Sequence, residues 1–243
     1  MKKIFFLIFL LLLGAGGWLF FRTNFLQQGS CQISVLVDKT DSLLAPPHSQ
    51  ELISMLKLEI YKWQSVEARL QIITNIDYNM VYTTTLPGRH VLLFNPSTRD
   101  AEIDSFTRTL QTNIEAINHL ETGRATSSIY GTVMREINRV AATGAETKVV
   151  VIYSDLQQNI PDQFSMYNEA DRALLNKHPE IVQKCLEEIL RPADLHGVSV
   201  YLIYKAKNDM DNKRFLSMSG LLKKMIVGAG GQVYIGANIV VEK

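Results

Sequence analysis

The sequence predicts an α/β fold with a doubly wound, mostly parallel sheet that carries one antiparallel edge strand, preceded by one N-terminal transmembrane helix. Three observations lead to this prediction. Several segments are continuously apolar, as strands buried on both faces are, and segments with helical periodicity separate them. One pair of extended segments has the spacing of a hairpin. The segments of the buried-strand type are residues 33–37, 148–153 and 198–204.

The remaining elements follow from periodicity in the same way. Apolar residues recur at helical spacing over residues 49–63, 103–120, 128–142, 179–190 and 213–227, the first of these beginning at Ser49 as its N-cap. Extended segments at 68–74 and 80–84 predict the hairpin that supplies the antiparallel edge strand. Two further strands are expected at 90–94 and 232–235.

The N-terminus reads as a membrane anchor. An uninterrupted apolar run at residues 4–21 spans about 27 Å as a helix, close to the thickness of a bilayer. The run is longer than the apolar core of a signal peptide and lacks a small-residue cleavage site, which favours an uncleaved anchor over a cleaved, secreted form. Lys2 and Lys3 before the run and Arg22 after it orient the N-terminus to the cytoplasm.

This reading divides the chain into three parts: a signal anchor at 1–22, a short tether at 23–30 and one domain at 31–243. The domain is therefore expected outside the cytoplasm, in the periplasm or on the cell surface. Of the 243 residues, 47% are hydrophobic and 20% charged, with a net charge of +1. That balance is typical of a globular domain and gives no electrostatic indication of a nucleic-acid partner.

Hard oxygen donors gather where predicted strands end. Asp38, Thr40 and Ser42 stand at alternate positions after the first strand, Ser127 precedes a helix, and Asp155 follows a central strand. Ligands bind at the carboxyl ends of the strands in open α/β sheets, so these loops are expected to meet. Carboxylates and hydroxyls without soft ligands suit Mg²⁺, or Mn²⁺ or Ca²⁺. The sequence thus predicts a divalent-metal site.

The motifs resemble those of the von Willebrand A family, whose metal-ion-dependent adhesion site has Asp-x-Ser-x-Ser after the first strand. The segment Asp38-Lys39-Thr40-Asp41-Ser42 matches this pattern, with threonine in place of one serine. The family also has a threonine before a helix and an aspartate after the fourth strand.

For the threonine, Ser127 in Ser127-Ser128-Ile129-Tyr130 aligns best, with Thr126 as the alternative. Asp155 matches the aspartate, although Leu156 stands where the family often has glycine. The final helix, Gly-Gly turn and last strand of the family are similar to residues 225–234.

The resemblance implies a Rossmann-like sheet and a role for each donor. Thr40, Ser42 and Ser127 would bind the metal directly, and Asp38 and Asp155 directly or through water. An acidic residue of a protein partner would complete the coordination. Function is then expected to be metal-dependent protein binding or complex assembly at the cell envelope, without catalysis and without a small-molecule substrate.

Two other functions fit the same residues. One is a structural subunit of an envelope complex in which the metal site is vestigial. A weaker one is metal-dependent phosphate hydrolysis, for which the sequence offers neither a base nor a phosphate loop beside the acidic residues. The two cysteines, Cys31 and Cys185, fit either a disulfide or two separate buried thiols.

Overall fold

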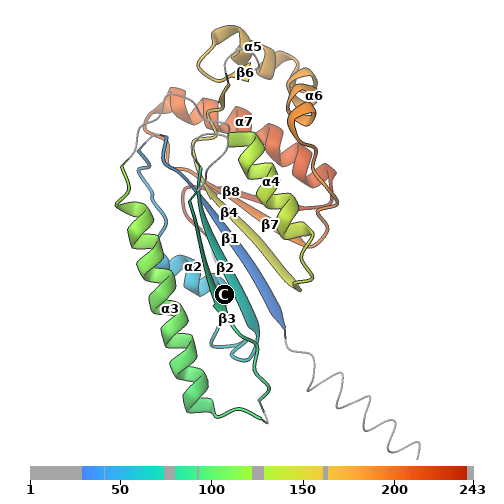
Figure 1. Ribbon diagram of the computed structural model, residues 1–243. Coiled ribbons are helices and arrows are strands. Elements are labelled where there is room, and N and C mark those ends of the chain that lie inside the picture. The colour runs from blue at the N-terminus through green and yellow to red at the C-terminus, as the bar shows by residue number, and fades with distance from the viewer. Residues whose placement is uncertain are drawn as a thin grey trace, which may run out of the picture.

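The computed structural model describes residues 29–40, 42–73, 80–91, 93–121, 129–160 and 164–239. Six strands form one sheet in the order β3-β2-β1-β4-β7-β8 (Figure 1). All neighbouring strands are parallel except β2 and β3, which pair antiparallel at one edge. This confirms the predicted sheet. The strands are β1 (Ser30–Asp38), β2 (Ser65–Ile73), β3 (Val81–Leu86), β4 (Thr147–Tyr153), β7 (Val198–Ile203) and β8 (Gln232–Gly236).

Helices cover both faces of the sheet. Helices α2 (Ser49–Met55) and α3 (Pro96–Asn118) bury their apolar side chains in the core on one face. The core on the other face receives the four helices α4 to α7 (Figure 1). These are α4 (Ile129–Ala141), α5 (Glu169–Lys177), α6 (Pro179–Ile189) and α7 (Asp209–Gly228). The arrangement is that of a doubly wound, Rossmann-like fold.

The central strand β4 shows why its sequence does not alternate between apolar and polar. Val150 and Ile152 enter the core beneath α4, whereas Val151 and Tyr153 enter the core beneath α3. Because both faces are covered, both sets of side chains must be apolar.

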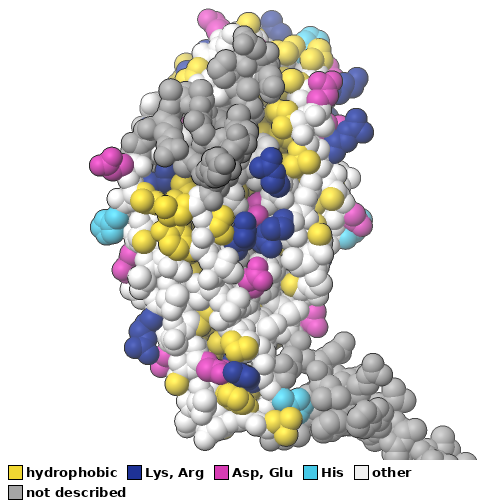
Figure 2. Space-filling model, viewed as in Figure 1, with side chains coloured by type: hydrophobic (Ala, Val, Ile, Leu, Met, Phe, Trp, Pro, Cys, Tyr) yellow, Lys and Arg dark blue, Asp and Glu magenta, His cyan; other side chains and the backbone are white. Residues whose placement is uncertain are grey.

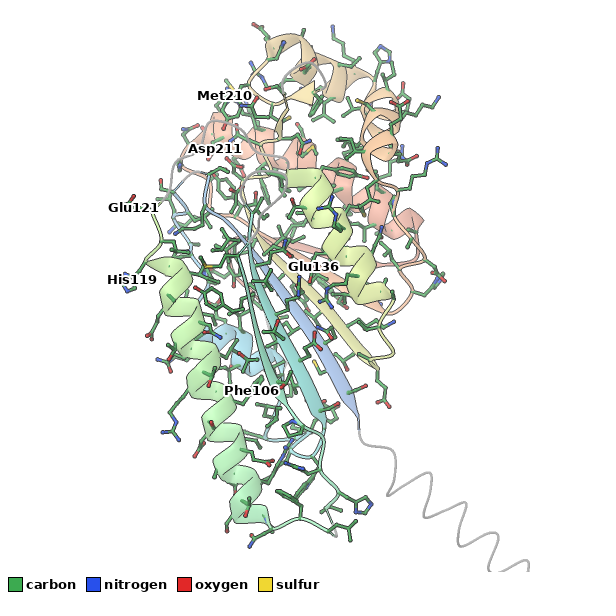
Figure 3. All side chains as sticks on the ribbon, in the orientation of Figure 1. Phe106, His119, Glu121, Glu136, Met210 and Asp211 are labelled. Atoms are coloured by element: carbon green, nitrogen blue, oxygen red, sulfur yellow. The ribbon has the colours of Figure 1, made fainter. Side chains whose placement is uncertain are left out.

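A buried carboxylate fixes α4 to the sheet. Glu136 of α4 accepts hydrogen bonds from Ser34 Oγ of β1 at 2.6 Å and from Arg139 Nε at 2.9 Å. Arg69 Nε of β2 lies 3.2 Å from the same carboxylate. Figure 3 shows Glu136 between α4 and the strands. In the view of Figure 2, Lys and Arg side chains lie among acidic ones across the middle of the molecule. The surrounding cations compensate the cost of burying Glu136.

The helix predicted over residues 49–63 ends at Met55, and His48, not Ser49, is its N-cap. Lys57 has φ of 45°, outside the helical range. Side-chain donors from elsewhere hold the residues after Met55 in another conformation. Gln64 Nε2 donates at 3.0 Å to Leu56 O, the carbonyl that Ile60 N would use in a continued helix, and Arg99 Nε donates to Lys62 O at 2.7 Å. The helical pattern was therefore overridden by tertiary hydrogen bonds.

The strand predicted at 90–94 is also wrong for the residues described there. His90 and Leu93 close a turn through a hydrogen bond from Leu93 N to His90 O at 3.0 Å. The Arg89 guanidinium lies over the Phe94 ring, 4.4 Å from its centroid. Leu93 is 83% exposed, so this apolar stretch gains no burial that would hold it against the sheet.

Other differences concern helix starts and short elements. Helix α3 begins seven residues before the predicted 103, because Asn95 Oδ1 caps Ser97 N at 2.9 Å and Pro96 follows the cap. Helix α5 and a small two-stranded sheet were not predicted. Asn168, which caps Ala170 N at 2.8 Å, was the available signal for α5. The small sheet consists of β5 (Asn159–Ile160) and β6 (Phe164–Ser165).

Candidate metal site

The strand order reverses direction between β1 and β4. From β1 the chain adds β2 and β3 on one side, and it then returns to place β4 on the other side. Such a switch point is where open α/β sheets bind ligands. Asp38 is the last residue of β1, and Asp155 stands two residues past the end of β4. Both carboxylates are buried, with 2% and 5% of the residue exposed.

The Asp38 carboxylate organises the loop that follows β1. Its Oδ1 accepts hydrogen bonds from Thr40 N at 2.9 Å and Thr40 Oγ1 at 2.6 Å. Its Oδ2 accepts from Ser154 Oγ at 2.7 Å, and the pairing of Val37 with Tyr153 places Ser154 directly opposite. Because Thr40 uses its hydroxyl hydrogen for this bond, the oxygen keeps lone pairs for a cation. The geometry therefore suits the predicted role of Thr40 as a direct ligand.

The turn after β4 holds the Asp155 carboxylate. Oδ1 accepts from Gln157 N at 2.8 Å, and Oδ2 accepts from Gln157 Nε2 at 3.1 Å. Between them Leu156 has φ of 57°, the left-handed region that glycine adopts most readily. Leucine thus occupies a glycine-type conformation at the position where the resembling family often has glycine.

Gln157 extends the Asp155 turn towards α7. Its Nε2 also donates to Asp211 Oδ1 at 2.9 Å, and Asp211 Oδ2 accepts from Tyr204 Oη at 2.6 Å. Figure 3 shows Asp211 in the first turn of α7. Neither Gln157, Asp211 nor Ser154 was predicted as a site residue. No local pattern marks them, because the network joins residues 54 positions apart.

Ser42 lies with Asp38 in the wall of a hollow of about 500 Å³ at the carboxyl edge. Lys39 lines the same hollow and donates from Nζ to Asn118 O, in the last turn of α3, at 3.3 Å. Partial burial lowers the pKa of the Lys39 ammonium from its ordinary value. The bond to α3 fixes one side of the loop that carries Thr40 and Ser42.

The predicted ligand Ser127 and its alternative Thr126 lie outside the described residues. Helix α4, which follows them, begins beside the turn after β4. Tyr130 N in its first turn donates to Gln158 Oε1 at 2.7 Å.

The donor set suits a hard divalent cation. Asp38, Thr40, Ser42 and Asp155 offer only oxygen, and the two aspartates supply negative charge. Among the described ranges, no cluster of three or more His, Cys, Asp or Glu residues is placed to hold a metal. A metal at this edge would therefore depend on the hydroxyls, as the resemblance implies.

The two cysteines are free thiols. Cys31 belongs to the core on the α2–α3 face, whereas Cys185 lies on α6 at the opposite face. Burial raises the pKa of the Cys31 thiol to about 11, so it stays protonated at neutral pH. Of the two interpretations left open, the structure has the separate thiols, although only Cys31 is buried and Cys185 is partly exposed.

The predicted membrane anchor, residues 1–22, and most of the tether lie outside the described residues. In the part of the chain that is described, none of the helices has the length and apolar character needed to cross a bilayer.

Comparison with protein families and with curated proteins gave no match. Solved structures gave distant matches. One is a mutant of the PilB minor pilin from Streptococcus sanguinis, at a TM-score of 0.46 and 10% identity, covering 87% of this chain and 58% of the pilin chain. Another is the human COPII-coat protein Sec24c, at a TM-score of 0.41 and 10% identity, covering 86% of this chain and 30% of the Sec24c chain. A third is an aerotolerance-related membrane protein from Bacteroides fragilis, at a TM-score of 0.34 and 9% identity, covering 86% of this chain and 92% of that protein's chain. This chain thus spans less than two thirds of the length of the pilin chain and of the Sec24c chain.

Proposed function

We propose that this protein is a membrane-anchored, von Willebrand A-like domain that binds a protein partner through a divalent metal at the carboxyl edge of its sheet. The observation that carries the proposal is the pair of buried carboxylates, Asp38 and Asp155, at the ends of two adjacent central strands. Buried carboxylates are costly unless hydrogen-bonded or bound to a metal, and the hydroxyls of Thr40 and Ser42 stand in the same loop as Asp38.

In this proposal the protein supplies a preorganised set of oxygens. Thr40, Ser42 and Ser127 bind Mg²⁺, or Mn²⁺ or Ca²⁺, through their hydroxyls, while Asp38 and Asp155 bind it directly or through water and balance its charge. The bound ion supplies an open coordination position for a carboxylate of the partner. Binding, and not catalysis, is the function that these groups serve.

Magnesium is expected to stabilise the full-length chain in lipid nanodiscs. At a concentration 100 times the dissociation constant, a ligand adds about 2.7 kcal/mol, which raises Tm by roughly 5–10 °C for a domain of this size. Asp38→Asn removes the charge and is expected to abolish the shift, measured by thermal unfolding with Mg²⁺ and with EDTA. Asp104→Asn, an equal charge change on the exposed side of α3, is the matched control and keeps the shift.

The alternative function, a structural subunit with a vestigial metal site, also has an observation in its favour. The carboxylate oxygens of Asp38 and Asp155 already accept hydrogen bonds from Thr40, Ser154 and Gln157. A wild-type Tm that is the same in Mg²⁺, Mn²⁺, Ca²⁺ and EDTA would favour this alternative. A shift that survives in Asp38→Asn would place the metal elsewhere.

The membrane orientation has its own test. With the N-terminus in the cytoplasm, alkaline phosphatase fused after Lys243 in a bacterial host is expected to be active, because it folds only outside the cytoplasm. Green fluorescent protein fused at the same position is expected to be dark. The reverse pair of results would contradict an extracytoplasmic domain.

A further inference from the structure

A small hollow of about 150 Å³ lies between α5 and α7, apart from the proposed metal ligands. Its walls combine cationic and thioether side chains. Those that matter here are Met166, Arg172, Met210, Lys213 and Arg214.

The hollow is electrostatically one-sided, since three cations line it and no acidic residue does. Arg172 Nη1 donates to the backbone oxygen of Met166 at 2.8 Å, and Arg214 Nη1 donates to Gln157 Oε1 at 3.3 Å. Both acceptors are neutral, and within the described ranges none of the three cations forms an ion pair. In that same part of the chain, Arg214 Nε is a buried donor without an acceptor. An anionic ligand in the hollow would supply the negative charge that its lining residues lack.

The apolar part of the hollow is formed by methionines. Met166 is buried, whereas Met210, which Figure 3 shows at the start of α7 beside Asp211, is 60% exposed. Methionine side chains adapt to varied apolar surfaces and are frequent at protein-binding sites. An exposed methionine beside cations that form no ion pair among the described residues fits a ligand that carries an apolar group next to a carboxylate.

We propose that this hollow, the α5–α7 pocket, binds a segment of a protein partner in which an Asp or Glu stands beside an aliphatic or aromatic residue. The carboxylate meets Arg172, Lys213 and Arg214, and the apolar neighbour packs on Met210. Charge complementarity selects this occupant over a neutral apolar peptide.

The α5–α7 pocket lies next to the proposed metal site at the carboxyl edge of the sheet, but peptide binding in the pocket does not require the metal. Arg214 contacts Gln157, whose Nε2 donates to Asp155. One partner surface therefore reaches both the pocket and the metal edge. The proposal stands on the pocket alone, and its test is performed in EDTA, so that it succeeds or fails independently of metal binding.

The test is a selection of a random displayed peptide library on the full chain in nanodiscs, in EDTA. We expect enrichment of peptides with Asp or Glu next to Leu, Ile, Met or Phe. One enriched peptide, synthesised, is expected to lose at least about tenfold in affinity on the double variant Arg172→Gln/Lys213→Gln, because charge-assisted hydrogen bonds are lost. Its own Glu→Gln or Asp→Asn version is expected to lose a similar factor on the wild-type chain.

The matched control is Lys223→Gln/Lys224→Gln, the same charge change on the far half of α7, which is expected to keep the wild-type affinity within about twofold. Lys213→Glu alone, at an exposed position, replaces the double variant if the loss of Arg172 unfolds the protein. Absence of acidic peptides among those enriched overturns the proposal. So does equal binding by the wild type and the pocket variant.

Discussion

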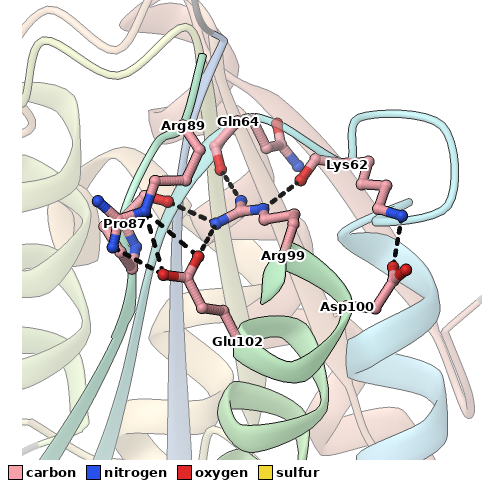
Figure 4. Close-up of polar contacts among 7 residues, drawn as sticks. All are labelled: Lys62, Gln64, Pro87, Arg89, Arg99, Asp100 and Glu102. Atoms are coloured by element: carbon pink, nitrogen blue, oxygen red, sulfur yellow. Dashed lines mark hydrogen bonds and ion pairs between the residues drawn. The ribbon is translucent and has the colours of Figure 1, made fainter. Parts of the chain in front are cut away.

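Replacing Arg99 with methionine is expected to lower the free energy of unfolding by about 4 kcal/mol, the range seen when a buried charged group and its partners are separated. Arg99 is fully buried, and its guanidinium donates to the carbonyls of Lys62 at 2.7 Å, Gln64 at 2.8 Å and Pro87 at 2.7 Å (Figure 4). Methionine fills a similar volume but leaves all three carbonyls without this donor. Urea unfolding followed by circular dichroism measures the difference.

Arg108→Met is the control for Arg99→Met, because Arg108 is an exposed arginine of the same helix. It is expected to change stability by less than about 0.5 kcal/mol. Arg99→Lys is expected to fall between the two, since one ammonium does not reproduce the planar fork that serves two loops. A methionine variant as stable as wild type would show that the three carbonyls find other donors.

The interactions of Glu102 with Arg89 and Arg99 predict that the stability of the protein depends on pH. Glu102 accepts from Arg89 Nη2 at 2.7 Å and from Arg99 Nη1 at 3.0 Å. The hydrogen bond from Arg89, followed by that from Arg99, lowers the pKa of the Glu102 carboxyl below its ordinary value. The ionised Glu102 carboxylate therefore contributes fully to the free energy of unfolding above its unfolded-state pKa. This contribution is lost as the pH falls through the lower folded-state pKa of Glu102.

Leu156→Ala is expected to destabilise the protein by about 3 kcal/mol, whereas Leu156→Gly is expected to be about 1 kcal/mol less damaging than alanine. Both remove a side chain that is fully buried in the core beneath α4. Only glycine relieves the left-handed backbone at φ of 57°. Chemical unfolding of the two variants measures the order.

Leu175 gives the opposite expectation and so serves as the control for Leu156. It is buried in the last turn of α5 with right-handed helical backbone, where glycine is up to about 1 kcal/mol worse than alanine. If glycine is also worse than alanine at position 156, the backbone there is not strained. The strain matters for the site, because the turn at Leu156 brings Gln157 back onto Asp155.

Local patterns predicted the mostly parallel sheet and its antiparallel edge strand. The apolar runs at 33–37, 148–153 and 198–204 became β1, β4 and β7, and the hairpin became the antiparallel edge. The motif order was also enough to expect Asp38 and Asp155 at one edge. Burial on two faces and parallel pairing explain this success, because both leave a continuous signal in a short stretch of sequence.

Hydrogen bonds between distant residues decided what the sequence could not. The helix expected to reach residue 63 stops at Met55, where Gln64 and Arg99 take carbonyls of the following loop. Helix α5 and the small sheet carry too little periodicity in too few residues to stand out.

By itself, then, the sequence determined a doubly wound sheet and a row of oxygen donors at its carboxyl edge, since strand burial and motif order are local properties. Only the tertiary structure decided how those donors are held. The bond from Ser154 to Asp38 and the bridge from Asp155 through Gln157 to Asp211 join residues 116 and 54 positions apart. The packing of α5 against α7, which forms the α5–α7 pocket, was also decided only by the tertiary structure. Such contacts depend on the packing of the whole domain, which no single stretch of sequence encodes.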